Sequence, residues 1–505
     1  MSSSPPDEVG STSITATTTD PDDAMAPHRS RVTWRAIAVS ACAAVLLHLP
    51  ALFRTAALNS DEATIATVAR MMRHGAGLYA GTVDRKPPGA FVLYRLLEPA
   101  FGSWTLAAAR WFALVAIIAA AWTIALEARR RWPAVSPLAV ALLFIVAFAL
   151  LPAEDSRAVG FELLATLPAV GAFVLGARGR TVLAGIALGL AALFKQPMLL
   201  GALPLTAQCL GFAAPWSRRV LRLAIAGLAC AATITAGLAP FGFHEAFSWF
   251  AGNGDNYLGG TRLSTVIVVG LEQVGTIVAL TAGIMIFAAL AWGRRRLPMD
   301  LAVWVISGAF ATAIGLRFVL HYFNQLLPAL VLAAAPALVG RQIFRRRWPR
   351  LAVVCLAGAA TFSMITVLSP DTFHDLPNVD RVAAAIRERT SPGDKVFVWG
   401  QAPEIYWLSR RDPATRYPHV GFVTGITPKR PGVPAYVLSM PGAAANLLAD
   451  LQANHPAIIV DAAIASVRGG DRYPLATSPI EQFVHSHYCA TDVIDGMTLL
   501  TPCTK

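Results

Sequence analysis

Charged residues are scarce in this sequence. Asp, Glu, Lys and Arg together make up 14% of the 505 residues, whereas a soluble globular domain typically carries about 25%. Hydrophobic residues make up 55%, and they gather in runs of about 15 to 25 residues, the length that crosses a bilayer as a helix. The composition therefore excludes an ordinary soluble domain and predicts a protein that crosses a membrane several times.

Acidic residues are scarcer than basic ones, which gives the chain a formal net charge of +12. Such an excess is also typical of nucleic-acid-binding proteins, but here the arginines stand at the ends of apolar runs. Arginine-rich loops of membrane proteins remain on the cytoplasmic side, so we interpret the clusters as topology signals and expect no nucleic-acid partner. The clusters lie at residues 129–131, 178–180, 218–222, 294–296 and 341–350.

The arginine clusters define a path through the cytoplasmic (inner) membrane for a domain of residues 31–369. Residues 1–30 are rich in Ser, Thr, Pro and Asp, which predicts a disordered cytoplasmic tail. About eleven helices follow, and the short run 181–194 is needed to keep every arginine cluster inside. The predicted spans are residues 34–53, a segment ending at 131, 133–151, 161–177, 181–194, 197–214, 220–239, 264–292, 299–316, 326–340 and 350–368.

The last part of the chain, residues 370–505, differs in composition from the apolar part. Residues 380–389 have the pattern of an amphipathic helix, and residues 395–399 and 457–460 have the pattern of strands. Gly and Pro punctuate the rest. Because an odd number of spans leaves the C-terminus outside, we predict a small α/β domain on the extracytoplasmic face.

Cysteines are few as well, six in all. Cys489 and Cys503 fall in the predicted outer domain, where an oxidising compartment would permit a disulfide, and the sequence leaves their pairing open. The other four lie in apolar runs, where we interpret them as packing residues: Cys42, Cys209, Cys230 and Cys355.

The first outer loop, residues 54–104, contains a predicted helix that begins with an acidic pair. Asn59 or Ser60 can cap its start. Its apolar residues have helical spacing, so we expect it to lie along the membrane surface with its apolar face down. Asp61 and Glu62 lie in its first turn, where carboxylates interact favourably with the helix dipole. On its own, the pair is explained as well by this effect as by a function.

A second motif in the same loop presents two cations. Arg85 and Lys86 precede Pro87 and Pro88, which fix the backbone. The apolar stretch 89–102 that follows is too short to span, so we expect it at the surface too. Rigidly held cations at a membrane interface suit a lipid phosphate, although ordinary interfacial cations are the alternative.

Further polar residues stand at the outer ends of predicted spans. Lys195 lies between two apolar runs, where a lysine is a functional candidate unless it extends to the interface by snorkelling. Interfacial anchoring explains Tyr322 better than its neighbours. The remaining candidates at this level are Glu154, Asp155, Glu162, Arg317, His321 and Gln325.

Carboxylates and cations from separate segments are therefore expected at one face of the membrane. A carboxylate can deprotonate an acceptor hydroxyl, and lysine and arginine can stabilise the charge that grows on a departing phosphate. This combination suits attack on a sugar that is attached to a lipid phosphate.

The ordered set of motifs resembles the GT-C superfamily of polytopic glycosyltransferases. It looks most like the branch of lipid A aminoarabinose transferase, protein O-mannosyltransferases and rhizobial lipopolysaccharide-core sugar transferases. The resemblance covers nearly all of the chain after the N-terminal tail. It is carried by Asp61-Glu62, Gly77-Leu78-Tyr79, Lys86-Pro87-Pro88-Gly89, Phe194-Lys195-Gln196-Pro197, the run 321–328 (HYFNQLLP), the run 396–400 (VFVWG) and Pro403-Glu404-Ile405-Tyr406.

The resemblance implies residue roles and substrates. It makes Asp61 the base for the acceptor, with Glu62 as a second catalytic candidate, and it places Lys86 on the lipid phosphate. It implies a polyprenyl-phosphate-linked sugar donor and action on the outer face of the cytoplasmic membrane. Some relatives have a metal-binding glutamate immediately before Lys-Pro-Pro, where this chain has Arg85, so metal ligands are not assigned and a divalent cation stays open.

The sequence thus predicts an inverting membrane glycosyltransferase that moves a hexose or pentose to a lipid, glycan or protein acceptor. Arg85, Lys195 and Arg317 are further candidates for the donor phosphate. The candidates for other substrate contacts are Tyr79, Glu154, Asp155, Glu162, His321, Tyr322 and Gln325. A transporter or flippase of polyprenyl-linked glycans is the alternative, but the sequence has no internal repeat of the kind that such proteins contain. A non-catalytic membrane scaffold would leave the cations unexplained.

Overall fold

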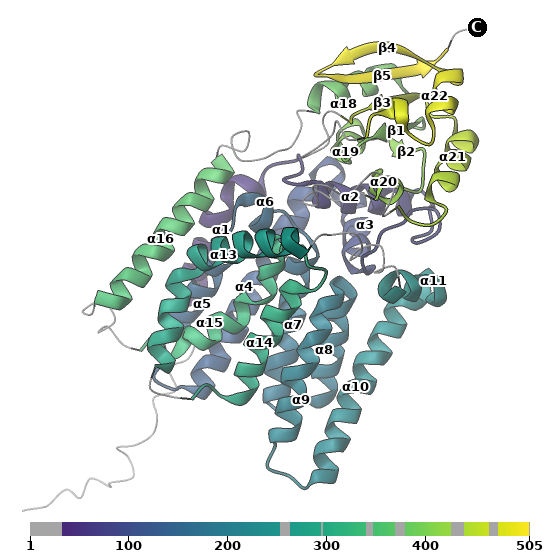
Figure 1. Ribbon diagram of the computed structural model, residues 1–505. Coiled ribbons are helices and arrows are strands. Elements are labelled where there is room, and N and C mark those ends of the chain that lie inside the picture. Colours follow the sequence, from purple (N-terminus) through teal and green to yellow (C-terminus); the bar gives the residue numbers. More distant parts are fainter. Residues whose placement is uncertain are drawn as a thin grey trace, which may run out of the picture.

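The computed structural model describes residues 33–252, 263–293, 296–339, 347–368, 379–425, 439–463 and 473–503. A bundle of helices forms the larger part, and a small mixed sheet with its own helices lies at one end of it (Figure 1). The predicted combination of a helical membrane domain and a C-terminal α/β domain is confirmed. The predicted N-terminal tail lies outside the described residues.

Helices occupy every apolar segment in which we predicted a span. Among the described residues, five helices are long and apolar enough to cross a membrane, and five shorter apolar helices accompany them. The number of spans therefore stays a prediction. The helices in the predicted spans are α1 (Trp34–Leu52), α4 (Thr105–Arg131), α5 (Pro137–Ala147), α7 (Phe161–Ala177), α8 (Thr181–Phe194), α9 (Ala202–Gly211), α10 (Trp216–Leu238), α13 (Leu263–Trp292), α14 (Met299–Ala313), α15 (Leu327–Ala334) and α16 (Arg347–Leu368).

The short helix α8 packs between α7 and α10. Gly185 and Gly189, four residues apart, bring its backbone close to α10. A Cβ atom at Gly189 would lie 2.8 Å from the carbonyl oxygen of Cys230, and one at Gly185 would collide with the carbonyl oxygen of Ala226. Small residues at this spacing permit the close helix contacts typical of membrane proteins, which explains why so short an apolar run forms a stable part of the bundle.

A buried carboxylate organises the arginine-rich end of α4. Glu127 is fully buried and lies 2.6 Å from Arg130, 2.8 Å from Arg131 and 3.5 Å from Arg178. Arg131 also lies 2.6 Å from Asp300 at the start of α14. The arginines that we interpret as topology signals thus also tie α4, α7 and α14 together.

The sheet of the C-terminal domain has the strand order β2-β1-β3-β5-β4. Strand β1 pairs in parallel with β2 and β3, and β5 pairs antiparallel with β3 and β4. The predicted helix 380–389 is confirmed as α18, and both predicted strands are present. The elements are α18 (Asp380–Arg389), β1 (Lys395–Trp399), α19 (Glu404–Ser409), β2 (Asp412–Pro413), α20 (Gly421–Thr424), α21 (Ala443–Asn454), β3 (Ile458–Asp461), α22 (Glu481–His487), β4 (Tyr488–Ile494) and β5 (Met497–Pro502).

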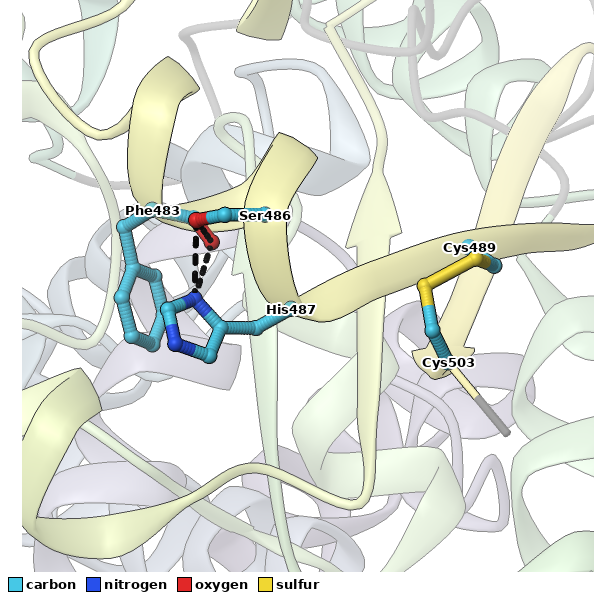
Figure 2. Close-up of a disulfide and its surroundings, with 5 residues drawn as sticks. All are labelled: Phe483, Ser486, His487, Cys489 and Cys503. Carbon is cyan, nitrogen blue, oxygen red and sulfur yellow. Dashed lines mark hydrogen bonds between the residues drawn. A yellow bond between two sulfur atoms is a disulfide. The ribbon is translucent and has the colours of Figure 1, made fainter. Parts of the chain in front are cut away.

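The two cysteines of this domain form a disulfide (Figure 2). Cys489 lies near the start of β4, and Cys503 follows the last residue of β5, so the bond closes the open end of the β4–β5 hairpin. The pairing that the sequence left open is therefore present.

The helices of the first outer loop, α2 (Ser60–Arg73) and α3 (Gly89–Phe101), lie between the bundle and the sheet domain (Figure 1). The expectation of a surface helix is wrong for α2, because residues 62–72 are all buried. The polar side of α2 is covered by α19. Arg70 pairs with Glu98 at 3.2 Å and lies 4.6 Å from the ring centroid of Trp407.

Candidate active site

The start of α2 places its two carboxylates in opposite surroundings. The side chain of Asn59 caps the helix by accepting a hydrogen bond of 2.8 Å from the amide of Glu62. Its amide group donates to the carbonyl of Glu154 at 2.6 Å, which fixes the turn to the short helix α6 (Ala153–Ser156). The side chain of Asp61 is 55% exposed, whereas Glu62 is fully buried.

Glu62 is held by four donors. Arg110 in α4 donates to Oε1 at 2.9 Å and to Oε2 at 2.5 Å. The amides of Leu58 and Val159 donate to the same carboxylate at 2.9 and 3.1 Å. Because these donors occupy both oxygens, we interpret Glu62 as the residue that anchors α2 to the bundle, a different role from the catalytic one suggested by the sequence.

Asp61 meets a histidine from a distant segment. Nε2 of His321 lies 3.8 Å from Oδ2 of Asp61, and Nδ1 lies 2.9 Å from Oδ1 of Asp155. Burial lowers the pKa of His321, but the carboxylates of Glu162, Asp155 and Asp61 outweigh it and raise the pKa above its ordinary value. The imidazole can therefore carry a positive charge beside Asp61.

The segment that carries Lys86 is rigid for reasons beyond its prolines. The carboxylate of Asp84 accepts a 3.0 Å bond from the amide of Lys86, and the hydroxyl of Tyr79 donates to the carbonyl of Lys86 at 2.8 Å. Tyr79 has φ 74°, a conformation that non-glycine residues rarely adopt. Burial raises the pKa of Asp84 to about 6, with Lys86 opposing and Asp61 adding to the shift. Tyr79 thus supports the Lys86 backbone, and its contact with substrate stays a prediction.

Gly89 allows the Lys86 segment to touch the end of α8. A Cβ atom at Gly89 would lie 2.7 Å from the carbonyl oxygen of Leu193 and 2.9 Å from the ring of Phe194, closer than carbon atoms approach in folded proteins. Since Lys195 follows directly, glycine at this position is what brings the two lysine-bearing segments together. Gln196 secures the contact with a 2.9 Å bond to the carbonyl of Arg85.

Both lysines lie over one aromatic ring. Nζ of Lys86 is 5.8 Å and Nζ of Lys195 is 5.9 Å from the ring centroid of Phe161. Lys195 is 4% exposed, lies 4.3 Å from the ring centroid of Tyr322 and pairs with Glu162 at 2.5 Å. Snorkelling therefore does not describe Lys195, which is held inside the protein.

The sheet domain covers this site. The guanidinium of Arg85 lies 4.9 Å from the ring centroid of Phe422 in α20. His419 lies near Arg85. Burial lowers the pKa of His419 to about 4, and the positive charge of Arg85 also lowers it. Glu404, the first residue of α19, is buried beside Asp61, and burial raises its pKa to about 7.

The remaining predicted residues are Glu154, Gln325 and Arg317. Glu154 contributes its backbone carbonyl to the Asn59 cap. Gln325 is buried and donates to the carbonyl of Tyr322 at 3.2 Å. Arg317 lies between Leu316 and Phe318, both with positive φ, and its assignment to the donor phosphate stays a prediction.

Three residues of this region were missed from the sequence. Arg110 had a signal, because it is a lone charge inside an apolar run. Glu404 stands in a motif that carried the resemblance, yet nothing local indicated that it would reach Asp61. His419 had no sequence signal, because its position depends on how the sheet domain docks.

Metal ligands are not assigned at this site. Among the described ranges, no group of three or more His, Cys, Asp and Glu side chains has the arrangement of a metal site. Arg85 brings a positive charge to the position before Lys86, where it opposes a second cation.

Comparisons with solved structures show which proteins have a similar fold. No family model and no curated protein matches the sequence. ArnT from Cupriavidus metallidurans, bound to undecaprenyl phosphate, superimposes with a TM-score of 0.58 at 16% identity, over 93% of this chain and 98% of that one. Its apo form gives 0.58 at 15% identity, over 92% and 97%. The apo oligosaccharyltransferase of Archaeoglobus fulgidus gives 0.50 at 14% identity, over 85% and 69%.

The chain has the fold of these ArnT structures. The fold that the sequence resemblance implies is thereby confirmed. In this fold, the outer loop and the sheet domain lie at the end of the helical bundle where the cations and carboxylates gather (Figure 1).

Proposed function

We propose that this protein is a membrane glycosyltransferase that moves a sugar from a polyprenyl-phosphate-linked donor to an acceptor hydroxyl. The observation that carries the proposal is the pair of lysines, Lys86 and Lys195, held over Phe161 on the same side of the bundle as the Asp61–His321 contact. Cations for a phosphate and a carboxylate for a hydroxyl are thus joined in one covered site.

Asp61 serves as the general base in this proposal. Its side chain is accessible, and a hydroxyl placed against it can transfer its proton as the oxygen attacks the anomeric carbon. His321, anchored by Asp155 at 2.9 Å, holds the carboxylate of Asp61 from the other side. A single displacement of this kind inverts the configuration at the anomeric carbon.

Lys86 and Lys195 bind the departing phosphate. As the bond between the anomeric carbon and the phosphate oxygen breaks, negative charge grows on that oxygen, and preorganised cations stabilise it. The rigid backbone around Lys86 and the pairing of Lys195 with Glu162 fix the ammonium groups before the donor arrives. Because the cations are already in position, they need to rearrange little during the reaction.

The site is proposed to face the extracytoplasmic side of the cytoplasmic membrane. The disulfide between Cys489 and Cys503 suits an oxidising compartment. The connection between α9 and α10, which precedes the cluster at 218–222, lies at the end of the bundle opposite the sheet domain (Figure 1). This arrangement agrees with the positive-inside rule.

A polyprenyl-linked donor is supported by the fold. The ArnT with the same fold was crystallised bound to undecaprenyl phosphate, and the cations found here suit that headgroup. The donor carries a hexose or a pentose, and the acceptor is a lipid, a glycan or a protein.

Binding of undecaprenyl phosphate to the purified full-length protein in detergent tests the donor side. We expect Lys86→Ala to weaken binding by about tenfold or more, since it removes a charge-assisted hydrogen bond. Arg95→Ala is the matched control, because Arg95 is an exposed cation on neighbouring α3. Equal affinities of the wild type and both variants would contradict the proposed site.

Deletion of the gene, followed by mass spectrometry of envelope glycolipids, glycans and glycoproteins, tests the reaction. The loss of one sugar, restored by the wild-type gene and not by Asp61→Asn, is the expected result. Transport of a polyprenyl-linked glycan by purified protein in vesicles, without sugar transfer, would instead support a flippase.

A further inference from the structure

The sheet domain places one buried carboxyl group, that of Glu404, at the end of the bundle where Asp61 lies. Glu404 is 5% exposed, and neither of its carboxyl oxygens has a hydrogen-bond partner of ordinary geometry among the described residues. The hydroxyl of Ser60 and the amide of Glu404 itself are close to this carboxyl without completing such a bond. Leaving a buried polar group unpaired is costly, so its retention calls for a reason.

The position of Glu404 is fixed from both sides. Arg70 in α2 donates to the carbonyl of Tyr406 at 3.1 Å, and its guanidinium packs on Trp407. The indole of Trp407 donates to the carbonyl of Thr55 at 3.3 Å. These contacts hold helix α19 firmly against α2. Glu404, the first residue of α19, therefore has a fixed position at the site.

Asp61 is the charged neighbour of Glu404 on α2. Burial raises the pKa of Glu404 to about 7, and the negative charge of Asp61 adds to that shift. Near neutral pH, Glu404 therefore carries a proton in a large share of molecules. A protonated carboxyl can both donate and accept a hydrogen bond, whereas the carboxylate of Asp61 only accepts.

We propose that Glu404 is an acceptor-binding residue, whose carboxyl binds a second hydroxyl next to the one that Asp61 deprotonates. The inference rests on the proposed glycosyltransferase function and narrows its acceptor. Two neighbouring carboxyls with different hydrogen-bonding capacity suit adjacent hydroxyls of a sugar ring. A serine or threonine side chain offers a single hydroxyl and would leave Glu404 unpaired. The acceptor is therefore a carbohydrate.

A purely structural role has a different signature. Glu404 lies in the first turn of α19, where a carboxylate interacts favourably with the helix dipole. In that role its removal would lower thermal stability and would affect donor and acceptor equally. As an acceptor-binding residue, its removal raises the KM for acceptor and leaves the affinity for undecaprenyl phosphate unchanged.

The experiment uses membranes from the deletion strain as the source of donor and unmodified acceptor. Purified full-length protein is added, and mass spectrometry follows the restored sugar while the amount of membrane is varied. We expect Glu404→Ala to need about tenfold more membrane for half-maximal transfer, as the loss of one hydrogen bond predicts. Its affinity for undecaprenyl phosphate is expected to equal that of the wild type. Glu388→Gln, an exposed acid on α18, is the control.

The pH profile separates Glu404 from its neighbours. As pH rises through about 7, wild-type Glu404 loses its donor proton and repels Asp61, so transfer should fall. Glu404→Gln keeps a donor at every pH, so its transfer should fall less between about pH 6 and about pH 8 than that of the wild type. His321 titrates in both proteins, so only the difference between their two pH profiles is caused by Glu404.

The outcomes are distinct. Transfer to a carbohydrate, with a higher acceptor requirement in Glu404→Ala and a flatter profile in Glu404→Gln, supports the inference. Wild-type kinetics in Glu404→Ala, identical pH profiles, or the sugar found on a protein side chain would overturn the inference while leaving the glycosyltransferase intact. No transfer by the wild type would overturn both.

Discussion

Oδ2 of Asp61 lies 3.8 Å from Nε2 of His321, although 260 residues separate them in the sequence. The other ring nitrogen of His321 is 2.9 Å from Asp155, and the amide of His321 donates to the same carboxylate at 3.1 Å. The segment before α15 is thereby tied to the short helix α6 and to the start of α2. A charged imidazole between two carboxylates makes this junction depend on pH.

The stability of the junction is expected to fall at alkaline pH. The pKa of His321 is raised by Glu162, Asp155 and Asp61, which together outweigh burial. Such a group contributes its full stabilisation below the unfolded pKa of about 6.5 and loses it as pH rises through the higher folded pKa. The apparent Tm of the wild type should therefore fall more steeply above about pH 6.5 than that of His321→Gln. Parallel Tm curves, measured by thermal unfolding in detergent, would contradict the charged imidazole.

The two adjacent acids of α2 are expected to separate stability from activity. Glu62→Gln leaves Arg110 buried without its counter-charge, which costs about 3–5 kcal/mol and should lower the Tm and the yield of folded protein. Asp61→Asn should unfold like the wild type but lose transfer by about a hundredfold or more, as the loss of a general base predicts. Thermal unfolding and transfer with deletion-strain membranes measure the two effects, with Glu388→Gln as the control.

The opposite results would change the roles assigned to Glu62 and Asp61. If Glu62→Gln kept its stability and lost activity, the carboxylate held by Arg110 would be the catalytic one. If Asp61→Asn transferred at the wild-type rate, another group would have to accept the proton.

The elements of this fold were largely predictable because hydrophobic pattern alone specifies them. The run 181–194 and the helix 380–389 have the predicted bounds, since their periodicity and end signals are local. The burial of α2 was not predictable in this way. Its polar side is covered by α19, more than 300 residues later in the sequence, and no local pattern reports such a contact.

The candidate site shows the same division. Asp61, Lys86 and Lys195 are candidates from the sequence because a charge beside an apolar run needs an explanation. The contact of Glu62 with Arg110 was not predictable, because two neighbouring carboxylates in a helix point in different directions and only the fold decides which one meets Arg110. Glu404 and His419 depend on docking of the sheet domain, which the sequence does not encode locally.

Gly89 is expected to be essential for donor binding without contacting the donor. Gly89→Ala would place a methyl group 2.7 Å from the carbonyl oxygen of Leu193, which pushes the Lys86 segment away from Lys195. Overpacking of this kind costs about 1–3 kcal/mol, and the separated lysines should bind undecaprenyl phosphate about tenfold more weakly. Gly227→Ala is the control, because nothing lies within 4 Å of its added methyl group. Equal binding by the two variants would refute the steric argument.

The disulfide is expected to stabilise the sheet domain without taking part in transfer. Cys489 and Cys503 are 14 residues apart, and closing a loop of this length stabilises a fold by about 3 kcal/mol in the chain-entropy model. The double variant with serine at both positions should unfold at a lower temperature and transfer normally below that temperature. Cys42→Ser removes a free, exposed thiol and is the control. An unchanged Tm would show that the β4–β5 hairpin is held by its other contacts.

Lys195 and Glu162 form a buried pair, so single and double substitutions should differ. Lys195→Ala leaves the carboxylate of Glu162 buried without a counter-charge, at a cost of about 3–5 kcal/mol, and its loss of activity could arise from misfolding. Lys195→Met combined with Glu162→Gln removes both charges at similar volume, which is often neutral for stability. The double variant should therefore keep the wild-type Tm.

The same double variant isolates the role of Lys195 in donor binding. Because it folds but lacks one of the two ammonium groups over Phe161, its affinity for undecaprenyl phosphate should fall by about tenfold or more. If the double variant bound undecaprenyl phosphate like the wild type, the Lys195–Glu162 pair would be a structural tie between α7 and α8, and Lys86 would be left as the cation for the donor.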